Sequence, residues 1–166
     1  QFPGVIQGGP FDQRGRPSLH ACRDLRTLRE RPDVLVFETE PLPGDLLVMG
    51  EVEVRLFVSS SAPDTDFTAK LIDVHPPTKD DPRGFAMNLT DGILRCRYRK
   101  SWTKPTLMAP GKVYDITIEP FATANLFKAG HRIRLDVSSS NFPRFDVNPN
   151  TGEPEGMARQ KQIASN

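Results

Sequence analysis

Serine is a residue type that could act as a catalytic nucleophile, and this chain has two serine triplets, at residues 59–61 and 138–140. A catalytic serine needs a base within reach, and it typically lies in a Gly-x-Ser-x-Gly frame on a sharp turn between a strand and a helix. Neither triplet has the flanking glycines or a predicted helix after it. We therefore predict that these hydroxyls satisfy backbone groups at strand ends, and that the chain contains no catalytic residue.

The possible metal ligands are scattered along the chain. The three histidines, His20, His75 and His131, fall in different predicted elements and share no ligand spacing, whereas zinc sites use Cys or His pairs a few residues apart. Asp64 and Asp66 are two oxygen ligands at a spacing seen in calcium loops, but the glycine-bearing continuation of such a loop is missing. There is also no glycine-rich phosphate loop. We expect no metal and no cofactor, and a strand-end or core role for His131.

The bulk properties favour one domain with a balanced charge. A length of 166 residues suggests one domain, and 22 Lys+Arg against 21 Asp+Glu give a net charge of +1. This balance gives no electrostatic case for nucleic acid or an anionic membrane as a partner. No apolar stretch approaches the roughly 18 residues that a membrane span needs.

The cysteines and the ends of the chain bear on its origin. Cys22 and Cys96 lie far apart, which favours free thiols in a reducing compartment, and no basic-then-apolar leader is visible. These features predict a cytoplasmic location. The chain starts at Gln1, so we expect a piece of a longer protein.

The stretch 131–138 shows the clearest secondary-structure pattern. Ile133, Leu135 and Val137 alternate with polar residues such as Arg134 and Asp136, which predicts a strand with an apolar buried face and a polar wet face. Further strands are expected at 33–40, 51–59, 66–75, 85–88, 93–98 and 112–121, with a hairpin turn at Asp91–Gly92 and inward faces at Val52, Val54, Leu56, Val58, Tyr114, Ile116 and Ile118. One helix is expected over 18–31, capped by Ser18 and ended by Pro32.

Short strands separated by turn signals are typical of an all-β protein. The 16 prolines argue against long helices. We therefore predict an antiparallel β-sandwich or jelly roll over residues 33–166, preceded by a lead-in over 1–32 that contains the short helix.

The segment after strand 131–138 is predicted to be an ordered loop. Pro143 lacks an amide donor, and the run 148–152 (Asn-Pro-Asn-Thr-Gly) favours turns. Phe142, Phe145 and an Arg-Asp pair on such a loop suggest a docking surface. The alternative is that the two phenylalanines only cap the local core.

Five stretches occur in an order that resembles a known family. They are GPFDQR (9–14), RPDVLVFETEPL (31–42), SSSAPDTDFTAKLIDVHP (59–76), NLTDGILRCRYR (88–99) and PGKVYDITIEPFATANLFKAGHRIRLDVSSSNFPRFDVNPNTG (110–152). Together they strongly resemble the C-terminal domain of the cocaine esterase and X-prolyl dipeptidyl peptidase family of serine hydrolases. Glutaryl acylases and α-amino acid ester hydrolases look like relatives.

The resemblance implies a jelly roll of the galactose-binding type that follows an α/β-hydrolase domain. That upstream domain carries the Ser-His-Asp triad, so no triad residue maps onto this chain. The expected role is a non-catalytic domain that packs against the catalytic domain and helps to shape its substrate pocket, in an enzyme acting on esters or amides, X-Pro peptides being one option. By position, the expected interface residues are Phe2, Phe11, Asn141, Phe142, Arg144, Phe145 and Asp146.

The resemblance leaves some points open. The segment 15–30 is longer than the family's usual link, and the family pattern continues beyond Asn166 into one more strand, so we expect the jelly roll to lack its last strand. Jelly rolls also bind sugars, and Tyr98, Trp102 and Tyr114 are the candidate aromatics for a carbohydrate-binding module. A module that makes a homo-oligomer is a further alternative.

Overall fold

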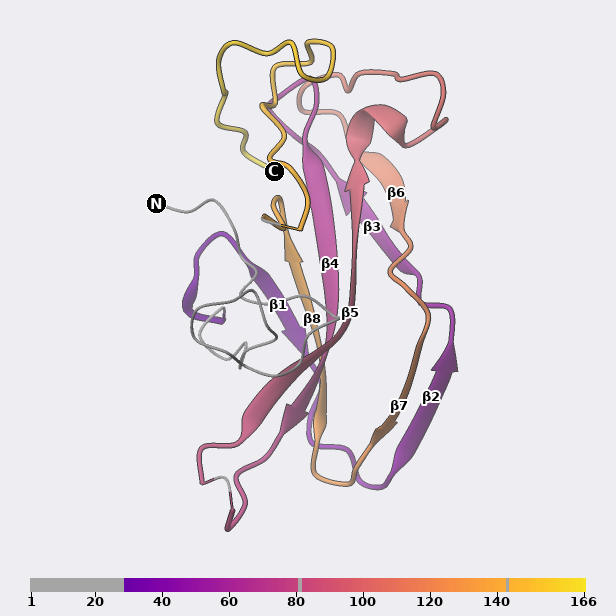
Figure 1. Cartoon of the computed structure of the whole chain (residues 1–166), viewed down its shortest axis with the longest axis vertical. Helices are drawn as coiled ribbons and strands as arrows, with labels where there is room; N and C mark the ends of the chain where they lie inside the picture. Colours follow the sequence, from indigo (N-terminus) through magenta and orange to yellow (C-terminus); the bar gives the residue numbers. More distant parts are fainter. Residues whose placement is uncertain (1–28, 81, 143) are drawn as a thin grey trace.

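A computed structural model describes residues 29–80, 82–142 and 144–166, and this part of the chain is built almost entirely from antiparallel strands (Figure 1). The helix predicted over 18–31 lies outside the described residues except for its last three positions. Phe2, Phe11, His20 and Cys22 lie outside them as well. No helix among the described residues is long and apolar enough to cross a membrane.

The larger layer is a four-stranded sheet. Its strands are β1 (Leu35–Glu38), β8 (Arg132–Ser138), β4 (Asp66–His75) and β5 (Phe85–Arg95), in the order β1-β8-β4-β5. All neighbours are antiparallel, and β4 and β5 form its longest pair, with a shift in register between Leu71 and Ile72. β4 therefore lies between β8 and β5 as a central strand.

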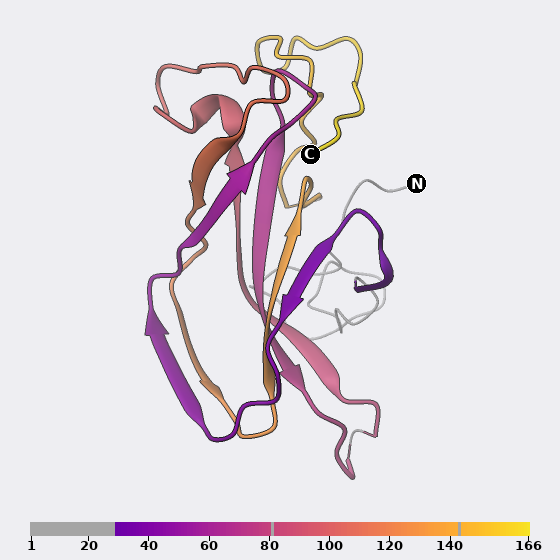
Figure 2. The same ribbon diagram turned by 180° about the vertical axis from the view of Figure 1, so that it is seen from behind.

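The smaller layer is a bent two-stranded ribbon. β2 (Leu46–Gly50) pairs with β7 (Thr123–Phe127), and β3 (Val54–Val58) pairs with β6 (Tyr114–Ile118). Figures 1 and 2 show the two pairs following one another along the same course, opposite one face of the larger sheet. The two layers form the β-sandwich that the sequence predicts.

The main apolar core fills the space between the layers. Phe67 and Ala69 of β4 and Leu94 of β5 meet Val54, Ile116 and Ile118 from the ribbon. Val52, Leu56, Val58 and Tyr114 pack against this cluster, which confirms the inward faces predicted for β3 and β6. Cys96, in the 3-10 turn Cys96–Tyr98, is fully buried in the same core, and burial raises the pKa of its thiol to about 12, so it is a packing residue.

The prediction that Arg134 and Asp136 line a wet face of β8 is wrong. Arg134 is 1% exposed and Asp136 is 2% exposed, whereas Ile133 and Leu135 on the other face are only half-buried. The Arg134 guanidinium donates from Nε and Nη2 to the two carboxylate oxygens of Asp136, each at 2.7 Å. Alternation shows that the two faces of a strand differ. It does not show that the polar face is wet, because paired charges can be buried.

The hairpin turn predicted at Asp91–Gly92 is also wrong, because both residues lie inside the continuous strand β5. A Cβ on Gly92 would lie 3.0 Å from backbone atoms of Pro120, so glycine is needed here for a close approach of chains. Asp91 is fully buried and faces Lys70. The tertiary contacts of these two residues override their local turn preference.

Within the described residues, the chain after β8 contains no strand. It loops over the end of the sandwich and folds back on residues 60–65, where the Ser61 amide donates to the Ser165 carbonyl at 2.9 Å (Figure 1). An apolar groove of ≈ 490 Å³ lies between β1 and β3 and is lined by Leu35, Phe37, Phe57 and Val137 among others. A further strand in the family pattern stays a prediction.

The buried Arg134–Asp136 pair gives a stability prediction. Arg134→Ala leaves the Asp136 carboxylate buried without its partner, so we expect the free energy of unfolding to fall by about 3–5 kcal/mol. The matched control is Arg55→Ala, which removes an exposed pair with Asp115 and should cost no more than about 1 kcal/mol. Urea denaturation of both variants measures the difference, and equal losses would contradict the burial of Arg134.

Candidate functional site

The face of the larger sheet that points away from the main core carries buried charges. We call it the charged face and define it by Thr68, Lys70, Asp91, Arg134 and Asp136, each no more than 2% exposed. The register places Lys70 between Asp91 of β5 and Asp136 of β8. Buried ions are tolerated only when they are paired and hydrogen-bonded, so the partners of Lys70 determine what can lie on this face.

The loop after β8 supplies those partners. Lys70 Nζ donates to Asn141 Oδ1 at 2.8 Å and lies 3.8 Å from Asp91 Oδ2. Asn141 Nδ2 donates to the same Asp91 oxygen at 3.0 Å, and Arg144 Nη1 donates to the other one. We call residues 139–142 and 144–152 the anchor loop, because Asn141 and Arg144 fasten it to the charged face.

A second set of contacts fastens the far end of the anchor loop. Asn148 Nδ2 donates to Asp64 Oδ2 at 2.9 Å and to Asp66 Oδ1 at 2.7 Å. Arg97 Nε donates to Asp64 at 2.7 Å, and Arg95 donates to both oxygens of Asp66 at 3.0 and 3.1 Å. Burial raises the pKa of the Asp66 carboxyl, and the hydrogen bonds from Arg95 and Asn148 oppose that rise. The two aspartates that resembled calcium ligands thus accept bonds from arginine and asparagine.

Arg144 also joins two aromatic rings at the surface. Its guanidinium carbon lies 5.2 Å from the ring centroid of Phe121 and 5.3 Å from that of Phe145. Phe121 is 59% exposed, and the bond to Asp91 holds the guanidinium in place. We call Phe121, Arg144 and Phe145 the arginine stack, a rigid group of aromatic and cationic surface at the edge of β5.

The structure gives the expected interface residues different surroundings. Asn141 is 1% exposed and is used within the domain, whereas the Asp146 side chain is 82% exposed and receives a bond from Arg95 at 3.3 Å. Phe142 and Phe145 are half-buried. Sequence reasoning missed Phe121, which follows β6 far from the loop and carries no local signal of this contact.

The hydroxyls of Ser60, Ser61 and Ser138, in the two serine triplets, are held in structural hydrogen bonds. Ser60 Oγ accepts from the Ala62 amide at 3.1 Å, Ser61 Oγ accepts from the Ser165 amide at 2.9 Å, and Ser138 Oγ lies 2.7 Å from Thr68 Oγ1. His75 and His131 lie at the opposite end of β4 and contact Asp73 instead. Among the described residues, no serine therefore has a histidine base within reach.

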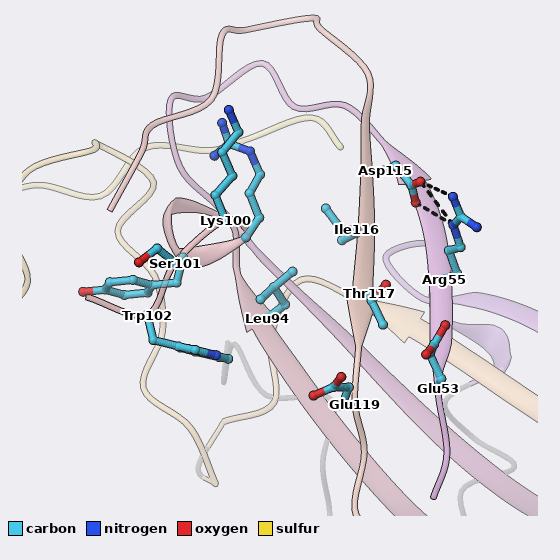
Figure 3. A pocket seen from close by; sticks show the side chains of 12 residues that line it. Glu53, Arg55, Leu94, Lys100, Ser101, Trp102, Asp115, Ile116, Thr117 and Glu119 are labelled. Carbon is cyan, nitrogen blue, oxygen red and sulfur yellow. Dashed lines mark hydrogen bonds and ion pairs between the residues drawn. The ribbon is translucent and has the colours of Figure 1, made fainter. Parts of the chain in front are cut away.

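An open hollow of ≈ 440 Å³ lies beside β6 and the 3-10 turn (Figure 3). Its wall carries Trp102, 74% exposed and stacked with Tyr98 at a centroid distance of 6.2 Å. Tyr114 has a different role, because its hydroxyl accepts from the Ala109 amide at 2.8 Å and its ring packs under Arg99. Two of the three aromatics considered for sugar binding thus share one surface, and carbohydrate binding stays a prediction.

Comparison of the sequence with known protein families identifies the family of this chain. Residues 7–164 match the family described as the X-Pro dipeptidyl-peptidase C-terminal non-catalytic domain. The chain belongs to this family. The match covers the whole sandwich and its anchor loop, and the family description agrees with the absence of a paired nucleophile among the described residues.

Individual relatives agree with the assignment. The chain is 52% identical to cocaine esterase of Rhodococcus sp. (strain MB1 Bresler) over 140 residues, which is 84% of this chain and 23% of that protein. A solved α-amino acid ester hydrolase superposes with a TM-score of 0.76 at 36% identity, over 80% of this chain and 22% of the other. A solved aminopeptidase from the marine sediment archaeon Thaumarchaeota archaeon gives a TM-score of 0.77 at 35% identity, over 89% and 27%. The chain thus corresponds to about a quarter of these larger proteins.

The anchoring of the loop gives a second stability prediction. Asn141→Ala removes the amide that bridges Lys70 and Asp91, and leaving these buried groups short of a partner should cost about 1–3 kcal/mol of unfolding free energy. The control is Gln160→Ala, an exposed amide whose loss should cost no more than about 0.5 kcal/mol. Chemical denaturation of both variants tests this, and a neutral Asn141→Ala would show that the loop is not fastened through this side chain.

Proposed function

We propose that this chain is the C-terminal domain of a serine hydrolase that cleaves esters or amides, and that it packs against an α/β-hydrolase domain which carries the nucleophile. The observation that carries the proposal is the 52% identity to cocaine esterase, a protein of which the match covers 23%. X-Pro peptides are a further option for the substrate, supported by the name of the matching family.

The chemistry of the described residues supports a reaction centre outside this domain. The hydroxyls of Ser60, Ser61 and Ser138 are engaged in structural hydrogen bonds, and Cys96 is a buried thiol with a pKa raised to about 12. None of these four residues offers an activated nucleophile at neutral pH. The contribution of this domain to catalysis is therefore the positioning and shaping of the neighbouring domain.

The arginine stack is the surface that we assign to the interdomain contact. Arginine and aromatic side chains dominate the energetics of protein interfaces. Because Arg144 is already held by Asp91, little side-chain freedom is lost when a partner packs on it. Phe142 and Asp146 belong to the same loop, and we include them in the proposed surface.

Labelling with a fluorophosphonate probe tests the class of enzyme. We expect the probe to label a serine of the full-length protein outside residues 1–166, and to leave the isolated 166-residue chain unlabelled. Mass mapping of the labelled peptide decides the outcome. A label on a serine of this chain, or no label on the full-length protein, would contradict the proposal.

Substitution in the arginine stack tests the interdomain contact. Phe121→Ala should change the stability of the isolated chain by no more than about 0.5 kcal/mol, because the ring is 59% exposed. In the full-length protein the same change should cost more than about 1 kcal/mol and lower activity, because it removes a buried contact.

The control for this test is Phe57→Ala on β3. Phe57 is 73% exposed and also lies beside an arginine, with the Arg55 guanidinium carbon 5.8 Å from its ring centroid. We expect its effects in the isolated chain and in the full-length protein to be alike. Alike effects for Phe121→Ala would exclude the arginine stack from the interface.

A further inference from the structure

Two histidines that the sequence separates meet at the lower end of the larger sheet. Asp73 and His75 are two positions apart on β4, so their side chains leave the same face of the strand. His131 immediately precedes β8, and the register of Val74 with Arg132 brings it opposite His75. The three side chains therefore converge from two neighbouring antiparallel strands.

The distances between their polar atoms are short. His131 Nδ1 lies 2.8 Å from Asp73 Oδ1, and His75 Nε2 lies 3.5 Å from Asp73 Oδ2. The two imidazole rings have centroids 4.2 Å apart, and one ligand atom from each of the three residues can be chosen so that all lie within 4.8 Å of one another. Ligand atoms around a tetrahedral zinc ion are about 3.3 Å apart, given bond lengths of about 2.0–2.1 Å.

Hydrogen bonding alone explains only part of this cluster. The Asp73 carboxylate is satisfied by His131 and by Asn125 of β7, whose Nδ2 donates to Oδ2 at 3.0 Å. His75 Nε2, in contrast, is buried and has no hydrogen-bond partner among the described residues, although it points to the same carboxylate. A buried ring nitrogen without a partner is costly, so this atom needs an explanation.

We propose that Asp73, His75 and His131 bind one divalent transition-metal ion, with Zn²⁺ as the best fit. Two imidazole nitrogens and one carboxylate oxygen are ligands that zinc accepts, and three protein ligands leave a position for water. The ion supplies the missing partner of His75 Nε2. The His75 side chain is 36% exposed and gives the ion a path from solvent.

The surroundings of the cluster suit a bound cation. The His131 side chain is 12% exposed and the Asp73 side chain is 2% exposed, so two of the three ligands are shielded from solvent. Asn125 orients the carboxylate from the side of the ribbon, as the outer partners of metal ligands commonly do. The ion would thus fasten β7 and the start of β8 to the end of β4, and bound zinc should stabilise the fold.

Calorimetric titration of Zn²⁺ into the full-length, chelator-treated protein tests the proposal. We expect one site that disappears, or weakens at least about 10–100-fold, in His75→Gln. This variant loses no hydrogen bond of the described residues, so it should fold. The control is Asp115→Asn, which alters a carboxylate exposed on β6 and should leave zinc affinity unchanged.

A second variant and a second measurement complete the test. His131→Gln should also weaken Zn²⁺ binding, and zinc should raise the unfolding temperature of the wild type but of neither histidine variant. Co²⁺ should give the intense visible absorption of a low-coordinate site in the wild type alone. Absence of a zinc-dependent shift in the wild type, or zinc affinity unaffected by both histidine variants, would overturn the proposal.

Discussion

The burial of Lys70 is the constraint on which much of this structure depends. Lys70 is 1% exposed in the middle of the central strand, and an ammonium group in such a place needs a carboxylate and further hydrogen-bond acceptors. Asp91 on the neighbouring strand supplies the charge, and Asn141 supplies the acceptor. Because Asn141 belongs to the segment after β8, satisfying Lys70 brings that segment onto the sheet.

The same contacts also hold side chains at the outer surface of the domain. The Asp91 carboxylate accepts from Asn141 through one oxygen and from Arg144 through the other. The carboxylate that neutralises Lys70 therefore also holds Arg144 of the arginine stack in place. At the other end of the anchor loop, Asn148 bridges Asp64 and Asp66. The described parts of the loop are thus fastened at both ends through buried polar groups.

The sequence predicted what depends on local pattern and missed what depends on tertiary pairing. Strand β4 was predicted with its observed bounds, and the inward faces of β3 and β6 are confirmed, because apolar alternation reports burial against a core. Strand β2 was missed because the largely exposed Leu46–Gly50 has no alternation to detect. Strand β7 was missed because its inward positions include polar Thr123 and Asn125, while Ala124 and Leu126 are exposed. Local preference predicts a turn at Asp91–Gly92 and an exposed side chain at Arg134. Only their partners in the folded domain show that both predictions are wrong. The meeting of His75 with His131 follows from strand register, which single-residue spacing does not reveal.

The charges on β4 also specify its register. A slip by one residue would turn Lys70 toward the main core and bring Ala69 and Leu71 to the charged face, because side chains alternate between the two faces. In the observed register Lys70 meets Asp91, Thr68 meets Ser138, and Asp73 meets His131 from the opposite face. An apolar pairing tolerates exchange of one aliphatic residue for another, whereas each of these polar pairs loses its partner after a slip. The polar contacts along both faces of β4 therefore select one alignment of the sandwich, and that alignment places the anchor loop and the histidine cluster at opposite ends of the domain.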